Sequence, residues 1–560
     1  MKYLFFALAL LSIKVSFAQN NKNKWGTVFG GFESNAQWYL NDKERGLPHP
    51  EDPIRSNNYL FLNYNYKKWT TGFQIESYEP NALLNFNPKY KGTNFGTYFI
   101  NYKSDKFEAT VGHFYEQFGS GLILRTWEDR ALGINNAIRG ARIIYRPTND
   151  IVLKSFYGQQ RSGFDVSKGK IFGADLDYNL SNLLKFSKTD LSFGISYVGR
   201  KEEIELENPS FSELTNAFGA RINFMHDAFY VNSEVNFKST DGILNVQNKL
   251  NNDFVKSGSA IGLNFGYSKK GLGVDVSLRR LENFSFLSER IPTSLLDGNT
   301  SLNYNDKILN FTPALTKQHH SNLANIYVYQ AQNRVDFSDQ SIMKAGETGG
   351  QIDFLYKFQK GTSLGGKYGT SVAVNLASWY NLPGKYSFVP SDYDVDFFGV
   401  GNKYFSDYNI EIKKKLSQEW LTGFYFINQY YNRRFIEGGD EINSNIIAAE
   451  GIYSFGKSKS IRFEAEHLWA DADRKNWIGG TLEYSFNDKL SVYVWDIYNY
   501  GNKNELNKTH YYNVGGAYRK GANRIAFNYG RQRGGLVCVG GVCRFVPEST
   551  GFTINLSTSF

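Results

Sequence analysis

The feature that most constrains this chain is a repeated strand pattern, in which apolar and polar side chains alternate over segments of about 10 residues. Residues 461–466, for example, read Ile-Arg-Phe-Glu-Ala-Glu. Successive side chains of a strand point to opposite faces, so Arg462, Glu464 and Glu466 would share one face. Three neighbouring charges would be very costly in the core of a soluble sandwich. The pattern therefore favours a barrel wall with an apolar face toward lipid and a polar face toward a water-filled lumen.

The connections between these segments alternate in length along the chain. Short polar turns, such as 67–68 and 269–271, alternate with long loops, such as 117–136 and 282–349. Outer-membrane barrels have this asymmetry, with short periplasmic turns and longer extracellular loops, and their strand number is even. We identify about 24 strand segments, within a range of about 22 to 26. The prediction is an all-β fold: a transmembrane, antiparallel, up-and-down β-barrel in the outer membrane of a Gram-negative bacterium.

The first residues predict export. Lys2 precedes an apolar stretch at 3–12, and Ser-Phe-Ala at 16–18 matches a signal-peptide cleavage site. We expect residues 1–18 to be a signal peptide and residues 19–560 to form a single barrel domain. The mean hydropathy of −0.44 is compatible with a barrel, because half of each strand faces a polar lumen. The net charge of +9 is dispersed, and an exported protein meets no nucleic acid, so we expect no such partner.

The last strand-like segment carries a second signal. Phe552, Ile554, Leu556 and Phe560 fall on one parity, and the residues between them are polar. This strand resembles the carboxy-terminal signal of bacterial outer-membrane barrels. The resemblance implies that these four residues form an assembly signal for the barrel assembly machinery. For the barrel as a whole, we expect outer-membrane lipid and lipopolysaccharide as further partners. We expect the strand to close the barrel by pairing with residues 25–40. Taken alone, the segment could also be the edge strand of a soluble sheet.

Two long loops have unusual compositions. Loop 117–136 is too apolar for a freely solvated loop, and it also contains Arg125, Glu128, Asp129 and Arg130. One interpretation is a loop folded into the lumen, where these charges form a constriction. The other is a loop packed against its own barrel wall or a partner, with internal ion pairs. Loop 282–349 is too long for a simple connection, and its apolar content predicts an ordered lid, plug or docking surface.

The remaining chemical motifs are weak. Cys538 and Cys543 are exported thiols at short spacing, which predicts a disulfide across a loop. Residues 361–365, Gly-Thr-Ser-Leu-Gly, match a serine-hydrolase elbow but lie in a turn between strands rather than between a strand and a helix. His319 and His320 lack the i, i+4 spacing of helical zinc ligands, so we assign them to a loop. We therefore expect no catalytic residue, metal or cofactor.

Residues 112–121 (Gly-His-Phe-Tyr-Glu-Gln-Phe-Gly-Ser-Gly) and 312–319 (Thr-Pro-Ala-Leu-Thr-Lys-Gln-His) are similar to a large Gram-negative barrel family without an assigned function. The resemblance implies no catalytic residues. The preferred hypothesis is a porin-like channel for small or polar solutes. Its selectivity would depend on loop 117–136 and on lumen residues Glu108, Arg142, Arg462, Glu464 and Glu466. The alternative is a non-enzymatic subunit of a secretion or outer-membrane assembly complex, which docks other envelope proteins through its long loops.

Overall fold

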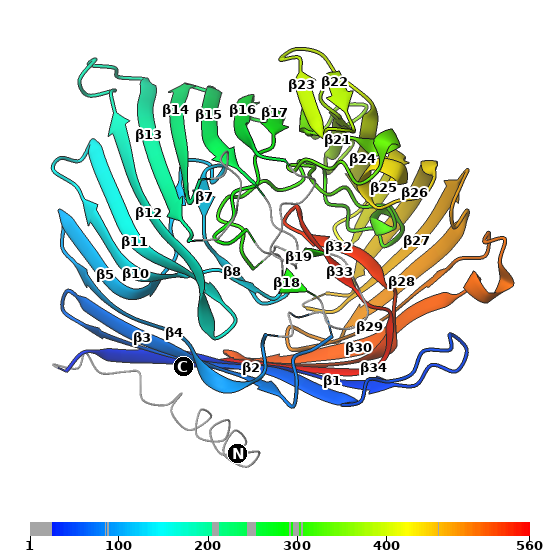
Figure 1. Ribbon diagram of the computed structural model, residues 1–560. Helices are drawn as coiled ribbons and strands as arrows, with labels where there is room; N and C mark the ends of the chain where they lie inside the picture. The colour runs from blue at the N-terminus through cyan, green and yellow to red at the C-terminus, as the bar shows by residue number, and fades with distance from the viewer. Residues whose placement is uncertain are drawn as a thin grey trace.

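The computed structural model describes residues 25–84, 86, 89–203, 212–242, 254–290, 293–294, 302–303, 306–456 and 458–560. The predicted signal peptide at 1–18 lies outside the described residues. The described chain forms a 24-stranded antiparallel sheet that closes on itself as a barrel (Figure 1). This confirms the predicted fold class. Within the described ranges, no helix is long and apolar enough to cross a membrane.

The barrel strands follow one another in chain order around the wall. They are β1 (Thr27–Leu40), β2 (Ile54–Tyr66), β3 (Trp69–Glu79), β4 (Gly92–Lys103), β5 (Phe107–Phe114), β10 (Ile138–Tyr145), β11 (Ile151–Ser162), β12 (Asp165–Asn179), β13 (Thr189–Lys201), β14 (Leu214–His226), β15 (Phe229–Asp241), β16 (Lys256–Lys269), β17 (Leu272–Glu282), β20 (Gly346–Phe358), β21 (Thr370–Tyr380), β24 (Lys403–Lys415), β25 (Trp420–Asn432), β26 (Glu441–Ser454), β27 (Ser460–Ala470), β28 (Trp477–Ser485), β29 (Leu490–Tyr498), β30 (His510–Lys520), β31 (Asn523–Gln532) and β34 (Ser549–Ser559).

The loops contain short elements of their own. They are β6 (Gln117–Phe118), β7 (Leu124–Arg125), β8 (Glu128–Asp129), β9 (Ile134–Asn135), β18 (Thr293–Ser294), β19 (Leu302–Asn303), β22 (Gly384–Ser387), β23 (Asp392–Val395), β32 (Gly535–Val539), β33 (Val542–Val546), the helix α2 (Arg433–Ile436) and the 3-10 turns η2 (Leu323–Asn325), η3 (Gln340–Ile342) and η4 (Glu505–Asn507).

The barrel closes where its first and last strands meet. β34 pairs antiparallel with β1, from Gly31 opposite Ser559 to Leu40 opposite Thr550. Beyond the ladder, the backbone groups of Phe560 and Gly30 exchange two hydrogen bonds of 2.9 and 3.0 Å. The pairing expected from the terminal strand is therefore observed, although β1 begins at Thr27 rather than Trp25.

The two faces of the wall differ as the alternation predicts. Large apolar side chains remain exposed on the outer face, as lipid-facing residues must be in a closed barrel. Examples spread around the wall are Val111, Tyr157, Phe218, Phe237, Phe527 and Ile554. Aromatic pairs such as Trp69 with Tyr102 lie at strand ends, where outer-membrane barrels carry aromatic girdles. A closed barrel with this apolar outer surface is a membrane-spanning structure, and the protein belongs to the outer membrane of a Gram-negative bacterium.

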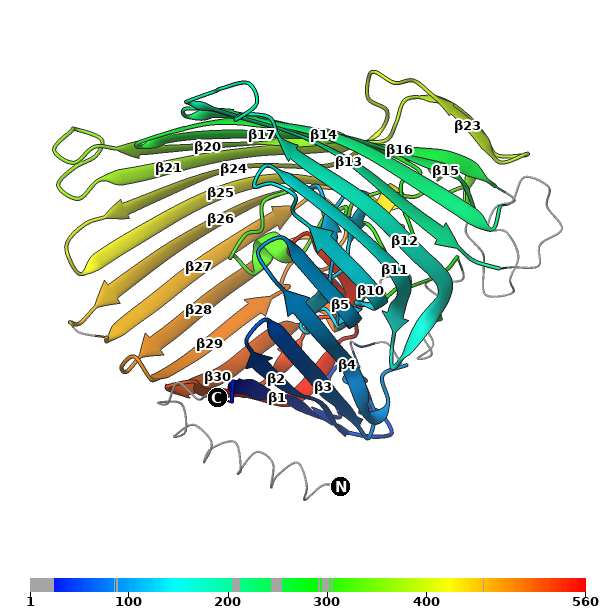
Figure 2. The same ribbon diagram turned by 90° about the vertical axis from the view of Figure 1, so that its left-hand side faces the viewer.

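Most connections sort by length between the two ends of the barrel. Figure 2 shows the tilted strands from the side, with the C-terminus at the same end as the turn from β24 to β25. This is the short-turn end; the other is the long-loop end. One exception is the tight turn at Gly163 between β11 and β12, which lies at the long-loop end. There the pairing of the two strands continues beyond a bulge to Ser162 opposite Asp165.

Candidate functional site

Three loop segments from the long-loop end lie inside the ring of strands. They are residues 117–136, the described part of 284–345, and 533–548, and we call them the plug. Figure 1 shows β7, β8 and the β32–β33 hairpin surrounded by the wall. The segments bond to one another: the Phe311 amide donates to the Gly121 carbonyl at 2.8 Å, and the Ala314 amide donates to the Gly541 carbonyl at 2.8 Å. The plug is therefore one connected body.

Apolar packing attaches one side of the plug to strands β21 to β30. Leu323, Ala324, Ile326, Tyr327 and Tyr329 are buried against inward-facing wall residues in one continuous cluster. The wall members include Trp379, Tyr404, Phe405, Ile427, Tyr431, Ile446, Leu468, Trp477, Ile497 and Tyr511. A water-filled lumen would give these side chains no apolar environment. Their position against the plug explains why the inner face of these strands is apolar at these positions near the long-loop end.

A second cluster attaches the opposite side of the plug to strands β5 and β10 to β14. Phe118, Ile123 and Leu124 of loop 117–136, with Phe286 and Leu309 of loop 284–345, are all fully buried there. Their wall partners are Phe114, Ile138, Phe156, Ile171, Val198 and Ala217. The plug therefore packs on opposite sides of the barrel, and it spans the lumen.

The polar side chains of the inner wall become more exposed toward the short-turn end. Along β24, the side chain of Asp407 is 1% exposed, that of Glu411 is 15% exposed and that of Lys413 is 48% exposed. Along β27, Glu464 is 1% exposed and Arg462, nearer the short turn, is 24% exposed. The plug thus covers one half of the lumen, and the other half is a polar vestibule.

A polar strip joins the plug to the wall at the border between these halves. Lys317 pairs with Glu411 at 2.5 Å, and His319 pairs with Asp407 at 2.9 Å. Glu466 accepts hydrogen bonds from the Ser321 hydroxyl and from the Leu323 amide, the latter at 2.9 Å. These contacts fix the segment just before the turn η2, whose apolar residues enter the first cluster.

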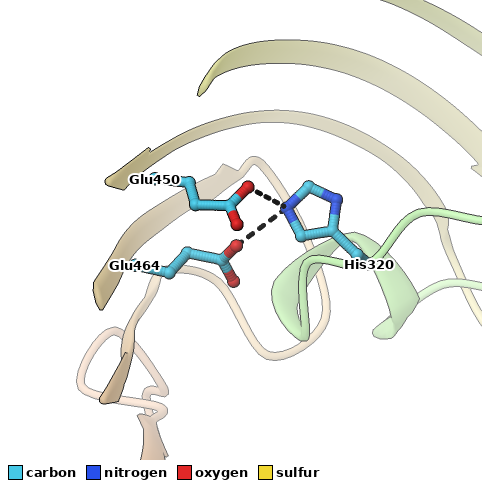
Figure 3. A group of neighbouring side chains, drawn as sticks. All are labelled: His320, Glu450 and Glu464. Carbon is cyan, nitrogen blue, oxygen red and sulfur yellow. Dashed lines mark ion pairs between the residues drawn. The ribbon is translucent and has the colours of Figure 1, made fainter. Parts of the chain in front are cut away.

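His320 lies in the same strip and faces two glutamates of the wall (Figure 3). Its Nε2 is 2.7 Å from Glu464 Oε2 and 3.9 Å from Glu450 Oε2. The hydrogen bond to Glu464 raises the pKa of the His320 imidazole above its usual value. Arg462 bridges the two carboxylates, with 2.8 Å to each. The arrangement can accept a proton on the imidazole, and it also presents donor atoms typical of a metal site.

The predicted constriction residues all lie in the plug. Arg130 pairs with Glu33 of β1 at 2.6 Å and with Glu128 at 3.2 Å. The Arg125 guanidinium lies over the Phe311 ring at 3.9 Å, and an Asp129 carboxylate oxygen accepts the Leu132 amide at 2.9 Å. The loop lies inside the lumen, as the constriction interpretation requires. Its charged residues also form ion pairs and pack against neighbouring groups, as expected for a loop packed against its own barrel. A role in solute selection stays a prediction.

The predicted lumen residues face inward. Arg142 pairs with Glu108 at 2.7 Å near the short-turn end, in a different sector from Arg462, Glu464 and Glu466. Their role in selectivity also stays a prediction. Cys538 and Cys543 form a disulfide between β32 and β33, within the plug.

Glu450, Glu411 and Asp407 were not among the residues predicted from the sequence. Each has inward parity on its strand, but so do many other polar residues. The strand register could have identified Glu450. It lies directly opposite Glu464 in the ladder between β26 and β27, so the two carboxylates are neighbours on the inner wall.

Comparisons with known proteins add the family and similar architectures. No curated protein matches the chain. The P pilus usher (PapC) translocation pore is similar at 9% identity over 95% of this chain and 99% of that chain, with a TM-score of 0.42. The siderophore receptor PirA from Pseudomonas aeruginosa is similar at 9% identity over 96% and 81%, with a TM-score of 0.42. A BenF-like porin from Pseudomonas fluorescens Pf-5 is similar at 9% identity over 83% and 99%, with a TM-score of 0.35.

These likenesses are too distant to carry an argument about function. The family match covers the whole sequence instead. The model described as "Family of unknown function (DUF6029)" matches residues 1–560, and the chain belongs to that family.

Proposed function

We propose that the protein is a gated outer-membrane channel for small polar solutes, which its own plug closes. The observation that carries this proposal is the division of the inner wall. The half beneath the plug is buried, whereas side chains near the short turns, such as Lys413 and Arg462, are exposed to the vestibule. Water-filled channels in outer-membrane barrels have a polar inner wall of this kind.

The contacts of the plug suit a gate that opens by displacement. The polar strip lies where the plug borders the vestibule. Its Lys317–Glu411 pair and the His320 side chain are partly accessible to water, so these contacts can exchange with solvent. The apolar clusters oppose opening, so the closed state dominates. It gives way only if a solute or partner binds the open state more tightly, or if a change of pH weakens the contacts of the docked plug. Glu108, Arg142 and Arg462 would then select among passing solutes by charge.

A second candidate function is the docking of envelope proteins at the long-loop end. Phe398 is 84% exposed and Val389 is 83% exposed, in the loop between β21 and β24. Exposed aromatic and aliphatic residues of this kind mark protein or lipid contacts. In this case the barrel would be a permanently closed subunit.

Recording of the purified protein in planar bilayers tests the channel against the subunit. If the protein is a channel, we expect the wild-type protein to open briefly between long closed periods. A silent barrel, both as wild type and after weakening of the plug, would contradict it. Stoichiometric copurification of one envelope protein with such a silent barrel would favour the subunit.

A further inference from the structure

We propose that His320, Glu450 and Glu464 form a site for a divalent transition-metal cation, tested here as Zn²⁺, that joins the plug to the barrel wall. The three ligands come from three separate parts of the chain. His320 belongs to the plug, Glu450 to β26 and Glu464 to β27 (Figure 3). A cation bound by all three would therefore connect the movable body to the fixed one.

The donor atoms are already close together. One ligand atom from each residue lies within 4.8 Å of the others. Two ligand atoms at about 2.1 Å from a tetrahedral zinc are about 3.4 Å apart. The separations of 2.7 Å and 3.9 Å from His320 Nε2 lie on either side of that value. Shifts of well under 1 Å in flexible glutamate side chains would meet the requirement, and water would complete the coordination.

The charge around this point favours a cation. Arg462 pairs with Glu450 and Glu464, and it lies opposite Glu483 in the ladder between β27 and β28. Glu466 adds another carboxylate next to Glu464 on the same face. One guanidinium thus lies among three carboxylates, Glu450, Glu464 and Glu483, and Glu466 is a further carboxylate beyond Glu464. The nearby Lys317 and Lys413 pair with Glu411. With a neutral imidazole the group has excess negative charge, which a divalent cation would offset.

The site is accessible from water, and neighbouring residues hold its ligand side chains in place. The His320 side chain is 36% exposed, at the border of the vestibule, so an ion can reach it from water. The imidazole packs edge-on against the Tyr425 ring at 4.4 Å, and the Tyr425 hydroxyl donates to Glu450 at 3.0 Å. Residues that position metal ligands in this way contribute to affinity themselves.

The donor types select the class of ion. Imidazole nitrogen together with carboxylate oxygen suits zinc and its transition-metal neighbours, whereas Mg²⁺ and Ca²⁺ prefer oxygen ligands alone. A metal needs the neutral imidazole, so a proton on His320 competes with it. Affinity for Zn²⁺ should therefore fall as the pH is lowered.

Titration calorimetry of the chelator-treated, folded full chain with ZnCl₂ at pH 7.5 tests the site. We expect one Zn²⁺ per chain, no competition by MgCl₂, and a loss of about tenfold or more in affinity for His320→Gln. His510→Gln is the matched control, because this histidine pairs with Asp496 of β29 outside the plug, and it should leave the affinity unchanged. Absence of stoichiometric binding, or equal losses in both variants, would overturn the site.

Binding of Zn²⁺ can be tested whether or not the protein is a channel, but an effect of Zn²⁺ on gating rests on the proposed function. Bilayer recordings separate the two. Zn²⁺ should lengthen the closed times of wild type, and so lower its open probability, and leave both unchanged in His320→Gln. Binding of Zn²⁺ without this effect would overturn the joining of plug and wall. Normal gating in a protein that binds no Zn²⁺ would overturn the metal site alone and leave the channel intact.

Discussion

Leu323 is the residue whose truncation should open the channel most directly. Its side chain is fully buried in the apolar cluster between the plug and strands β27 and β28, and its amide donates to Glu466. Leu323→Ala keeps the amide and removes most of the side chain. A buried leucine-to-alanine change costs about 2–5 kcal/mol, part of it from the cavity that remains. Because this packing exists only when the plug is docked, the substitution destabilises the closed state and not the open one.

The magnitude can be converted into a gating change. A loss of about 3 kcal/mol raises the ratio of undocked to docked plug by about two orders of magnitude. Single-channel recording should show a matching rise in the open probability, with the conductance of each opening unchanged. The control is Leu482→Ala, the same change at a lipid-facing position of β28 that is 46% exposed, which should leave gating unaltered. An unchanged open probability for Leu323→Ala in a folded barrel would refute the reasoning.

Two further predictions concern buried charge and pH. Arg161→Ala should destabilise the barrel by about 3–5 kcal/mol in urea titrations, because it leaves Glu76 without the guanidinium that pairs with it at 2.6 Å, both side chains being 1% exposed. Arg161→Met with Glu76→Leu should recover most of that loss, and no recovery would contradict the explanation. In metal-free buffer, protonated His320 favours the docked plug, since its pKa is raised beside Glu464. That contribution is complete below about pH 6.5 and disappears as the pH rises through the raised value, so the open probability should increase with pH in wild type and stay flat in His320→Gln.

The barrel itself could be predicted because its signals are local. Alternation along a strand needs only neighbouring residues, and the turns between strands are read from short polar segments. The closing pair of β1 and β34 follows from an even number of strands, without any knowledge of side-chain contacts. The pairing of β11 with β12 up to Asp165 does not follow from the alternation, because the bulge beside Arg161 interrupts the period of two.

The plug could be predicted only in part, because its contacts are distant in sequence. The apolar content of loops 117–136 and 282–349 indicated ordered segments, but not their partners. Contacts such as Ser120 with Glu234, or Ser321 with Glu466, depend on how the loops cross the lumen. The cluster around His320 likewise requires both the strand register and the path of the plug. Neither follows from composition.

Removal of the central plug segment is the most direct test of a channel closed by its own loops. The Asn283 amide donates to the Ala345 carbonyl at 2.8 Å, so the ends of the segment already meet. Residues 284–344 can therefore be replaced by the two-residue turn Asn-Gly, which suits a tight β-hairpin. Heat-modifiable mobility in gel electrophoresis would verify that the shortened barrel is folded. A channel closed by its own loops should then show a stable, continuously open conductance far above that of wild type. A folded, shortened barrel that stays closed would contradict this mechanism.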